Sequence, residues 1–503
     1  MLASIPSAIV FGVDGSPVTV EVHVGVGLPG LTIVGLPDAA CREARDRVRA
    51  AVMAAGVAWP PRKITINLAP SGTRKMGSGL DLAMAMGVLV ANGDLTQEQT
   101  RGLGFLGELG LDGTVRPVPG IVPLVDAVEC EAVVVPVVAA ADAVLVDGPK
   151  VRPVRTLGEL FRVLKGDEPW PDHEFAPRVL APDVGLDLAD VRGQPVVRRA
   201  LEVAAAGSHH LLMVGPPGAG KTMLASRLPG LLPDLCREEA MEATRVHSAA
   251  GLSLHGGLIT RPPFRAPHHT ATMVALVGGG TEAMRPGEVS MAHSGVLFLD
   301  ELAEFAPAVL DALRQPLEEG VIRISRAKFA ARLPARVLLV AAMNPCPCGE
   351  AARPGACRCP EGLLSRYRRR LSGPLLDRFD LRIDVLLPEV DQLLGGEPGE
   401  PTSVVAARVA VARDRAVLRG VRANAFLSGP EVERWAPLAP DARDLLATVL
   451  RTGRLSARGL ARIRRVALTL ADLADHDGPL TAGQVGTALQ LRADVAGVQG
   501  VAA

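Results

Sequence analysis

The chain lacks the features that would place it in several specialised classes of protein. Its 503 residues carry no formal net charge, so no global field indicates a nucleic-acid or membrane partner, and any basic surface must be local. Seven cysteines in so long a chain do not make a disulfide scaffold. Hydrophobic residues make up 48% and charged residues 21%, which is a globular composition and not a disordered one.

Long apolar runs are also missing. The most apolar segment, Ala132 to Val146, is too short to span a bilayer and is interrupted by Pro136 and Asp142. The first residues, MLASIP, include no basic residue, and Asp14 soon ends the apolar stretch, so no signal peptide is predicted. We therefore expect a soluble, cytoplasmic protein without a membrane partner.

The length predicts about three domains, and the first covers residues 1–165. Strict alternation over Val18–Val24 predicts a half-buried strand, and Lys63–Leu68 predicts another. Between them a helix is expected to start at Asp38, which can cap it, and to stop at Gly56. This block is therefore predicted to be α+β.

Two Pro- and Gly-rich breaks divide the rest of the chain. Residues 166–185 are rich in proline and acidic residues and are predicted to form a linker. The second block, 186–392, alternates strands with helices and should contain a mostly parallel sheet. After a break at 395–401, residues 402–503 show only helical patterns, which suit a small bundle.

A complete phosphate-binding motif opens the second block. It directly follows the apolar run 210–214 and precedes a helix-like stretch, 223–228, which is the context that the motif requires. Its backbone N–H groups are expected to bind phosphate oxygens, Lys221 to reach the β- and γ-phosphates, and the Thr222 hydroxyl to ligate Mg²⁺. We expect the loop to bind ATP or GTP through Gly215, Pro216, Pro217, Gly218, Ala219, Gly220, Lys221 and Thr222.

Two further apolar runs end in polar side chains suited to nucleotide hydrolysis. Residues 296–299 are followed by Asp300, expected to hold the metal through water, and by Glu301, expected to activate the attacking water. Residues 336–343 are followed by Asn344. Together with the phosphate loop, this order of motifs resembles the AAA+ ATPases. The resemblance implies that ATP is the nucleotide and that Asn344 senses its γ-phosphate.

The same resemblance assigns two arginines. Arg378, in the segment GPLLDRFD, matches the family's arginine finger, which reaches the ATP of a neighbouring subunit. Arg458, in the segment SAR, resembles the second sensor, an arginine that contacts nucleotide from the lid. A surface salt bridge is the alternative for both, and nearby arginines, among them Arg462 and Arg464, compete with Arg458 for the role.

Two segments of the second block exceed a minimal core. Residues 249–280 resemble the insertion in the second helix of the helicase and chelatase clade of AAA+ proteins. The segment 320–328 resembles the hairpin that precedes the first sensor and faces the central pore, where Arg323, Arg326 and Lys328 are candidates for DNA phosphate contacts. A solvated basic turn is the alternative. Only Phe329 accompanies these charges, so base stacking is not indicated.

Four cysteines form a close cluster in the sequence directly after Asn344. Cys346, Cys348, Cys357 and Cys359 have the number and proximity that suit a tetrahedral Zn²⁺ site stapling a loop with little core. C-x-C pairs are less typical of zinc than C-x-x-C pairs, so free or redox-active thiols are the alternative. The remaining cysteines, Cys41, Cys130 and Cys236, are expected to be core residues.

Taken as a whole, the chain resembles the YifB/ComM family, the magnesium-chelatase-like AAA+ ATPases. The resemblance rests on GLPGLTIVGLPD at residues 27–38, PFRAPHHT at 263–270 and NPCPCG at 344–349. It implies a multidomain α/β protein with a Lon-protease-like (S5-like) α+β domain, an AAA+ parallel-sheet core and a C-terminal helical lid. It also implies a hexameric, ATP- and Mg²⁺-dependent motor that drives DNA branch migration in recombination or natural transformation.

The resemblance of the first block to the proteolytic domain of Lon does not extend to its chemistry. Lon needs a serine nucleophile and a lysine base. Here the position of the nucleophile falls on Gly79, next to Ser78, and the segment that should supply the base offers Val122 and no lysine. We expect no protease activity and an assembly or substrate-contact role for this block.

Two other functions compete with the DNA motor. One is a chelatase motor subunit that helps insert Mg²⁺ into a porphyrin, although such a subunit is not expected to need the first block. The other is a nucleotide-gated scaffold, which leaves Glu301 and Arg378 without a role.

Overall fold

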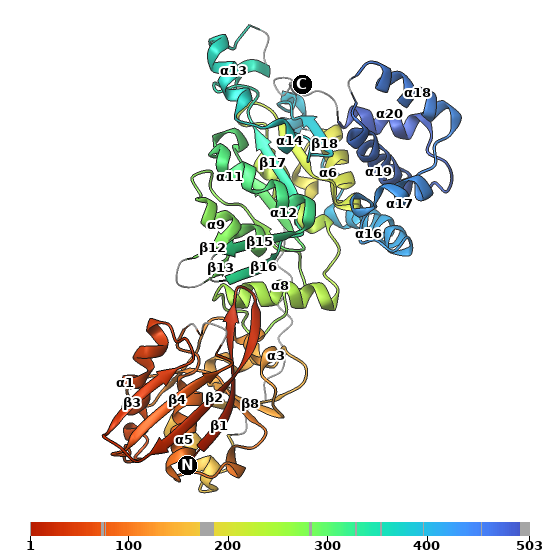
Figure 1. The fold of residues 1–503 in the computed structure, drawn as a ribbon. Coiled ribbons are helices and arrows are strands. Elements are labelled where there is room, and N and C mark those ends of the chain that lie inside the picture. Colours follow the sequence, from red (N-terminus) through yellow and green to blue (C-terminus); the bar gives the residue numbers. More distant parts are fainter. Residues whose placement is uncertain are drawn as a thin grey trace.

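The computed structural model describes residues 2–71, 75, 77–171, 186–280, 284–326, 329–352, 355–395, 397–453 and 455–492. The N-terminal block, the central block and the C-terminal helices follow one another in the ribbon of Figure 1. Within the described residues, none of the helices combines the length and the apolar character needed to cross a membrane.

The N-terminal block is α+β, as predicted. A four-stranded sheet has the order β1-β2-β4-β3, in which only β3 and β4 run parallel. A parallel three-stranded sheet, β5-β8-β9, and the short pair β6-β7 complete it. The strands are β1 (Leu2–Phe11), β2 (Asp14–Gly25), β3 (Gly30–Val34), β4 (Lys63–Ala69), β5 (Leu103–Phe105), β6 (Glu108–Leu109), β7 (Val115–Arg116), β8 (Ala132–Pro136) and β9 (Lys150–Val154). The helices are α1 (Ala39–Ala54), α2 (Asp81–Asn92), α3 (Ile121–Ala127), α4 (Ala140–Ala143) and α5 (Leu157–Lys165).

Helix α1 begins and ends where the sequence places it. The Asp38 carboxylate accepts a hydrogen bond from the Cys41 amide at 2.7 Å, which satisfies a backbone donor that the helix leaves free. Gly56, just after the helix, has φ of +82°, a conformation that glycine adopts without steric cost. The apolar face of α1, including Val48 and Val52, is buried against the N-terminal core.

The segment assigned to the linker starts by packing on the N-terminal block. Trp170 lies against its core, and the Arg152 guanidinium stands 4.9 Å from the centre of the Trp170 ring. Glu168 accepts a hydrogen bond from Arg162 at 2.7 Å. The described start of this segment therefore packs on the first block, and residues 172–185 lie outside the described residues.

The central block contains the expected parallel sheet, in the order β11-β14-β17-β10-β18. Its strands are β11 (Phe264–Arg265), β14 (Val296–Leu299), β17 (Leu338–Met343), β10 (Leu211–Val214) and β18 (Leu381–Asp384). The block also contains two separate antiparallel pairs, β12 (Gly278–Gly279) with β13 (Arg285–Pro286) and β15 (Val321–Arg326) with β16 (Phe329–Pro334). The helices are α6 (Pro195–Gly207), α7 (Lys221–Ala225), α8 (Arg237–Ala249), α9 (Met273–Val277), α10 (Glu288–Met291), α11 (Pro307–Ala312), α12 (Arg314–Glu319), α13 (Glu361–Arg369), α14 (Gly373–Leu376) and α15 (Val390–Gly395).

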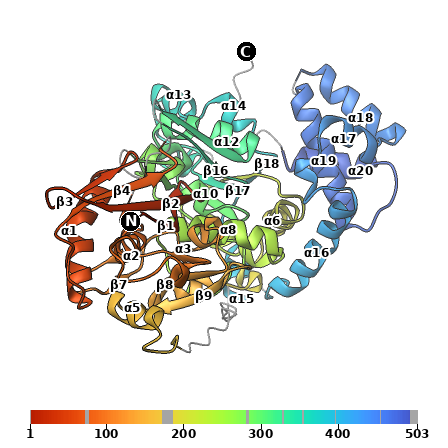
Figure 2. The same cartoon turned by 60° about the horizontal axis from the view of Figure 1, so that its bottom comes forward.

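The described part of the third block is helical, as predicted. Its helices are α16 (Thr402–Leu418), α17 (Gly429–Trp435), α18 (Pro440–Arg451), α19 (Ala457–Leu473) and α20 (Ala482–Gln490). Residues of α16 and α19, among them Val409 and Val466, share one apolar core with α6 and with the buried face of the central sheet. Figure 2 shows these helices beside α6, on the side of the core away from the N-terminal strands. We refer to the third block below as the lid.

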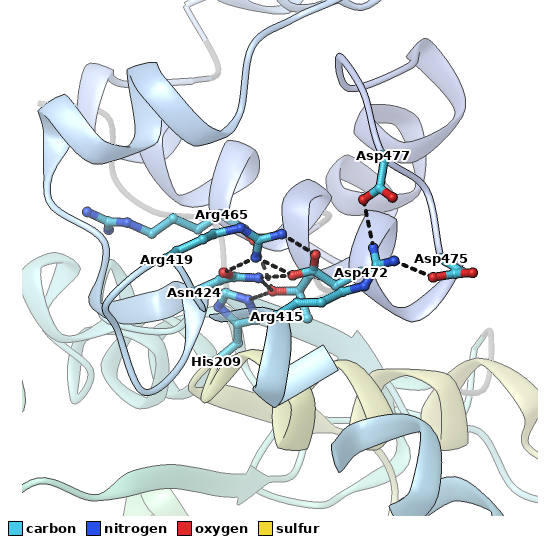
Figure 3. A network of polar contacts seen from close by, with 9 residues as sticks. His209, Arg415, Arg419, Asn424, Arg465, Asp472, Asp475 and Asp477 are labelled. Carbon is cyan, nitrogen blue, oxygen red and sulfur yellow. Dashed lines mark hydrogen bonds and ion pairs between the residues drawn. The ribbon is translucent and has the colours of Figure 1, made fainter. Parts of the chain in front are cut away.

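A buried polar network joins the lid to the central block (Figure 3). The Asp472 carboxylate accepts hydrogen bonds from Arg419 and, at 2.7 Å, from Asn424. Asn424 also donates to the Thr469 hydroxyl at 3.1 Å, and Nε2 of His209, just before β10, lies 2.8 Å from the same hydroxyl oxygen. Because these groups are buried, each needs its partner, and the network fixes α19 against the start of β10.

The N-terminal block is docked on α8 and on the loop that follows it. The amides of Gly120 and Val122 donate to the backbone oxygen and the hydroxyl of Ser248, at 2.8 and 3.2 Å. The Asp142 carboxylate accepts from the amide of Gly256 at 2.8 Å. The turn between β1 and β2 reaches the β15–β16 hairpin, where Val13 shares a core with Leu333. The first block therefore contacts both predicted additions to the core.

We expect His210 to make the stability of the central block depend on pH. Its Nδ1 accepts a hydrogen bond from the Leu339 amide at 3.1 Å, and burial lowers its pKa from 6.5 to about 4. The unfolded chain takes up the proton first, so His210 costs no stability above pH 6.5 and destabilises the fold as the pH falls toward 4. Between pH 7.5 and pH 5 the loss should be on the order of 2 kcal/mol.

Urea unfolding at the two pH values tests this expectation. His210→Asn keeps an acceptor near the position of Nδ1 without a titrating ring, so its midpoint should fall less on acidification than that of the unmodified protein. The control is His255→Asn, because His255 is exposed and should leave the pH dependence unchanged. Equal pH dependence in all three proteins would show that His210 is not the source.

Candidate functional site

The phosphate loop lies where β10, β17 and β18 end. The Gly215 amide donates to the Met343 oxygen at 3.1 Å, and the Val385 amide donates to the Val214 oxygen at 2.7 Å. A Cβ at Gly215 would stand 2.2 Å from the Val385 oxygen, so only glycine fits there. Gly218 has φ of +77° and open space on its Cβ side, as a loop that curls around an oxyanion requires.

Lys221 starts α7, so the predicted helix begins two residues earlier than expected. Its ammonium donates to the oxygens of Gly215 and Pro216, at 2.7 and 2.9 Å, and to Oδ1 of Asn344 at 3.2 Å. Burial lowers the pKa of Lys221, while Asp300 and Glu301 oppose the shift. The cation is thus positioned inside the loop and beside Asn344, where a phosphate chain would lie.

Thr222 and Asp300 form the second part of the site. The Thr222 hydroxyl donates to the Asp300 carboxylate at 2.6 Å. Adjacent hydroxyl and carboxylate oxygens are the hard ligands that Mg²⁺ prefers, so these two residues fit a magnesium ion beside the phosphate loop. Bound there, the ion would neutralise phosphate charge.

Glu301 has a partner that the sequence analysis did not identify. Its backbone adopts φ of +51°, an uncommon conformation for a residue other than glycine. Its carboxylate lies 3.1 Å from Nδ1 of His269, which belongs to the insertion between α8 and β14. The two histidines of the stretch PFRAPHHT are visible in the sequence, but the sequence does not show which of them contacts Glu301 in the folded chain.

Gln194 is a second residue that the sequence analysis missed. Its amide nitrogen donates to the oxygens of Ala219 in the phosphate loop and of Leu386 after β18, at 3.0 and 3.2 Å. Gln194 directly precedes α6, which packs against α16 and α19. The phosphate loop is therefore tied to the helix that carries the lid.

Arg378 lies near the amino ends of the strands, on the opposite side of the sheet from the phosphate loop. The Asp380 and Leu381 amides donate to the His210 oxygen, each at 3.0 Å, which places this segment at the amino end of β10. The phosphate loop begins at the opposite end, roughly 16 Å away along the strand. The Arg378 guanidinium pairs with Glu318 and is largely buried. It lies away from the phosphate loop of its own chain.

The arginines at the start of α19 have different surroundings. Arg458 is exposed on the first turn. Arg462, one turn later, donates to the Arg378 oxygen at 3.0 Å and to the Asp380 carboxylate at 2.6 Å. Arg464 holds α17 through the Ala436 oxygen at 2.8 Å. Arg462 is therefore the arginine of this group that contacts the Arg378 segment.

The predicted DNA-contact residues are only partly described. Arg323 is exposed on β15, and Glu319 lies 3.0 Å from its guanidinium. Lys328 and the side chain of Arg326 lie outside the described residues. Two exposed basic features were not predicted from the sequence, because neither forms a recognisable motif. They are Arg332 on β16 and the last turn of α13, where Arg366, Arg368 and Arg369 are exposed.

The structure brings the four clustered cysteines together. Their Sγ atoms all lie within 4.8 Å of one another. Cys41 is buried, as expected, but Cys130 is only half-buried and Cys236 is exposed at the start of α8. The expectation of a core position was therefore wrong for Cys236, because a residue that precedes a helix can face solvent even beside apolar neighbours.

The side chains of the protease-like segment that the structure describes are held by hydrogen bonds or buried. The Ser78 hydroxyl is half-buried and donates to the Glu108 carboxylate. Val122 is buried. Lys75, the nearest lysine in the sequence, is also buried, and its ammonium donates to the Pro70 oxygen.

Comparison with known proteins places matches along most of the chain. Three family models match: subunit ChlI of Mg-chelatase over residues 20–140, magnesium chelatase subunit ChlI over 187–393, and its C-terminal model over 399–492. An uncharacterized Mycobacterium tuberculosis protein is 49% identical over 94% of this chain and 95% of its own. YifB of Escherichia coli is 43% identical (93% and 92%), and the competence protein ComM of Haemophilus influenzae is 43% identical (94% of each).

We expect His269→Ala to lower the turnover number of ATP hydrolysis about fivefold, because Glu301 loses the group that orients it. The dissociation constant for ATP should not change, since His269 is not bonded to the phosphate loop. His255→Ala is the control, because the exposed His255 ring also lies in the insertion and contacts the Ser253 hydroxyl instead. Steady-state kinetics would contradict the assignment if both variants behaved alike.

Proposed function

Because the chain belongs to the magnesium-chelatase-like AAA+ ATPases, the family of YifB and ComM, we propose that it is a cytoplasmic ATP-driven motor that remodels DNA as a hexameric ring. Membership of this family implies ATP and Mg²⁺ as cofactors. The proposal divides the chain into the three blocks of the sequence analysis, with the first extended to residue 171.

One observation carries the proposal of ATP hydrolysis: five groups from three separate segments are linked around one loop. Lys221 reaches Asn344, and Thr222 reaches Asp300, whose carboxylate also accepts from the Glu301 amide at 2.9 Å. In this arrangement Lys221 binds the phosphates, while Thr222 and Asp300 hold Mg²⁺. Glu301 takes the proton of the attacking water, and Asn344 orients that water against the γ-phosphate.

The position of Arg378 supports a ring. A guanidinium at the amino end of β10 cannot neutralise charge at the carboxyl end of the same strand, so its target is the nucleotide of an adjacent subunit. Arg462, bonded to the same segment, would move with it. Arg458 is exposed, and as a second sensor it would have to reach nucleotide across an interface.

DNA as the substrate is supported by the likeness to ComM, whose name is that of a competence protein, and by local positive charge. Arg323 and Arg332 on the β15–β16 hairpin are exposed, as is the arginine-rich last turn of α13, although the chain as a whole is neutral. Cations in such groups bind phosphates without reading sequence. We propose the hairpin arginines as DNA contacts.

The second candidate is a chelatase motor subunit. The names of the matching family models favour it, and one of them covers most of the first block. The presence of that block therefore does not argue against a chelatase, contrary to the expectation from the sequence. The match to a competence protein over 94% of this chain favours DNA.

Mixing two inactive variants tests whether Arg378 acts between subunits. Lys221→Ala should not bind ATP, and Arg378→Gln should bind it but hydrolyse it at least roughly 100-fold more slowly. In mixed rings, an intact Arg378 from the first variant faces an intact phosphate loop of the second, so hydrolysis should return. A mixture that stays as inactive as its components would mean that Arg378 acts only within its own chain.

Stimulation of ATP hydrolysis distinguishes the substrates. We expect forked or four-way DNA to raise turnover severalfold and Arg323→Glu with Arg332→Glu to reduce that stimulation without changing basal turnover. The Glu301→Gln variant should bind ATP and stall. Stimulation only by protoporphyrin with chelatase partner subunits would contradict the DNA proposal and support the chelatase function. If ATP were not hydrolysed under any condition, the protein would be a nucleotide-gated scaffold and not a motor.

A further inference from the structure

The four cysteine sulfurs form one compact group. Sγ of Cys346 lies 3.3 Å from that of Cys348 and 3.7 Å from that of Cys357, and the Cys348 and Cys357 sulfurs are also 3.7 Å apart. Four thiolates at 2.3 Å around a tetrahedral zinc ion stand about 3.8 Å from one another. The observed separations are close to that value and much longer than a disulfide bond of about 2.05 Å.

The segment around these sulfurs has little else to hold it. Residues 345–360, which we call the cysteine loop, are rich in proline, glycine and alanine and contain no leucine, isoleucine, valine or aromatic residue. Of its cysteines only Cys346 is buried, while Cys348 is exposed and Cys357 and Cys359 are intermediate. A loop of this composition cannot be fixed by burial of apolar surface and requires another link.

Backbone geometry around the first pair supports metal ligation. The Ala351 amide donates to Sγ of Cys346 at 3.3 Å, and Gly349 turns the chain with φ of +80°. An amide that points at a thiolate sulfur stabilises its negative charge and orients it, as groups around metal ligands commonly do.

The cysteine loop is also part of the nucleotide site. A Cβ at Gly349 would stand 2.5 Å from Cδ of Pro217, so the loop packs directly on the phosphate loop. Asn344, which directly precedes the loop, accepts a hydrogen bond from Lys221 through its side chain, and the Tyr367 hydroxyl of α13, beyond the end of the loop, donates to the Asn344 backbone oxygen at 3.1 Å. Whatever fixes the cysteine loop therefore fixes the sensor asparagine against the phosphate loop.

We propose that Cys346, Cys348, Cys357 and Cys359 bind a structural Zn²⁺ ion that holds the cysteine loop on the phosphate loop and so keeps Asn344 in place. Four protein ligands leave no open position, so the ion takes no part in the chemistry. Its loss releases the loop, weakens ATP binding and leaves the parallel sheet intact.

Metal analysis of the purified full-length chain is the direct test. Mass spectrometry should find one zinc ion per chain in the unmodified protein and in Cys236→Ser, the control with an exposed cysteine outside the cluster. Cys348→Ser and Cys359→Ser should retain little zinc. Replacement by Co²⁺ should give the sulfur-to-cobalt charge-transfer absorption of a tetrathiolate site, in the unmodified chain and the control only.

A second readout separates a structural zinc from a failure to fold. Cys348→Ser should keep the helical circular dichroism of the unmodified protein and lose about tenfold in ATP affinity. Zinc content does not depend on DNA or on turnover, so this test can fail while the proposed motor function stands. A chain purified without zinc, whose cluster thiols react freely or form disulfides, would overturn the proposal.

Discussion

Parallel pairing of β10 with β17 and β18 is the constraint on which the rest of the site depends. In this register Val214 lies opposite Met343 and Asp384, so the phosphate loop, Asn344 and the segment after β18 all leave the sheet at the carboxyl ends of the strands. The close approach of Gly215 to the Val385 oxygen allows no side chain there. Gly215, Asp300 and Asn344 each directly follow a buried strand, so the candidate site inherits the rigidity of the core.

The same register explains what was predictable from the sequence. Three strands of four to six apolar residues are followed by Gly215, Asp300 and Asn344. This pattern indicates a parallel sheet, because only parallel strands bring their carboxyl ends, and the polar groups that follow them, to the same side of the sheet. The capped helix α1 was predictable because Asp38 and Gly56 act on their near neighbours. The pairing of His269 with Glu301 was not, since it joins the insertion to the sheet and has no local signature. Nor was the burial of Arg378 against Glu318, which depends on how α12 and α14 pack.

Electrostatics shows a similar division between local and long-range effects. The neutral composition correctly indicated that positive charge must be local, but it could not show that the last turn of α13 exposes three arginines. Buried charge is concentrated instead around Asp380. Although burial opposes it, contacts with His209 and Arg462 keep the pKa of Asp380 well below its usual range. His209 belongs to the central block and Arg462 to the lid. The Asp380 carboxylate therefore links these two blocks near Arg378.

The nucleotide site is therefore built from segments that each continue into a different part of the molecule. Asn344 leads into the cysteine loop and α13, Glu301 contacts the insertion through His269, and Gln194 ties the phosphate loop to α6 and the lid. A change at the γ-phosphate can be transmitted only through groups that touch it or touch its ligands. These three connections meet that condition, and each leads away from the sheet. In the proposed motor, these contacts are the routes by which hydrolysis would reach the lid, the insertion and the last turn of α13.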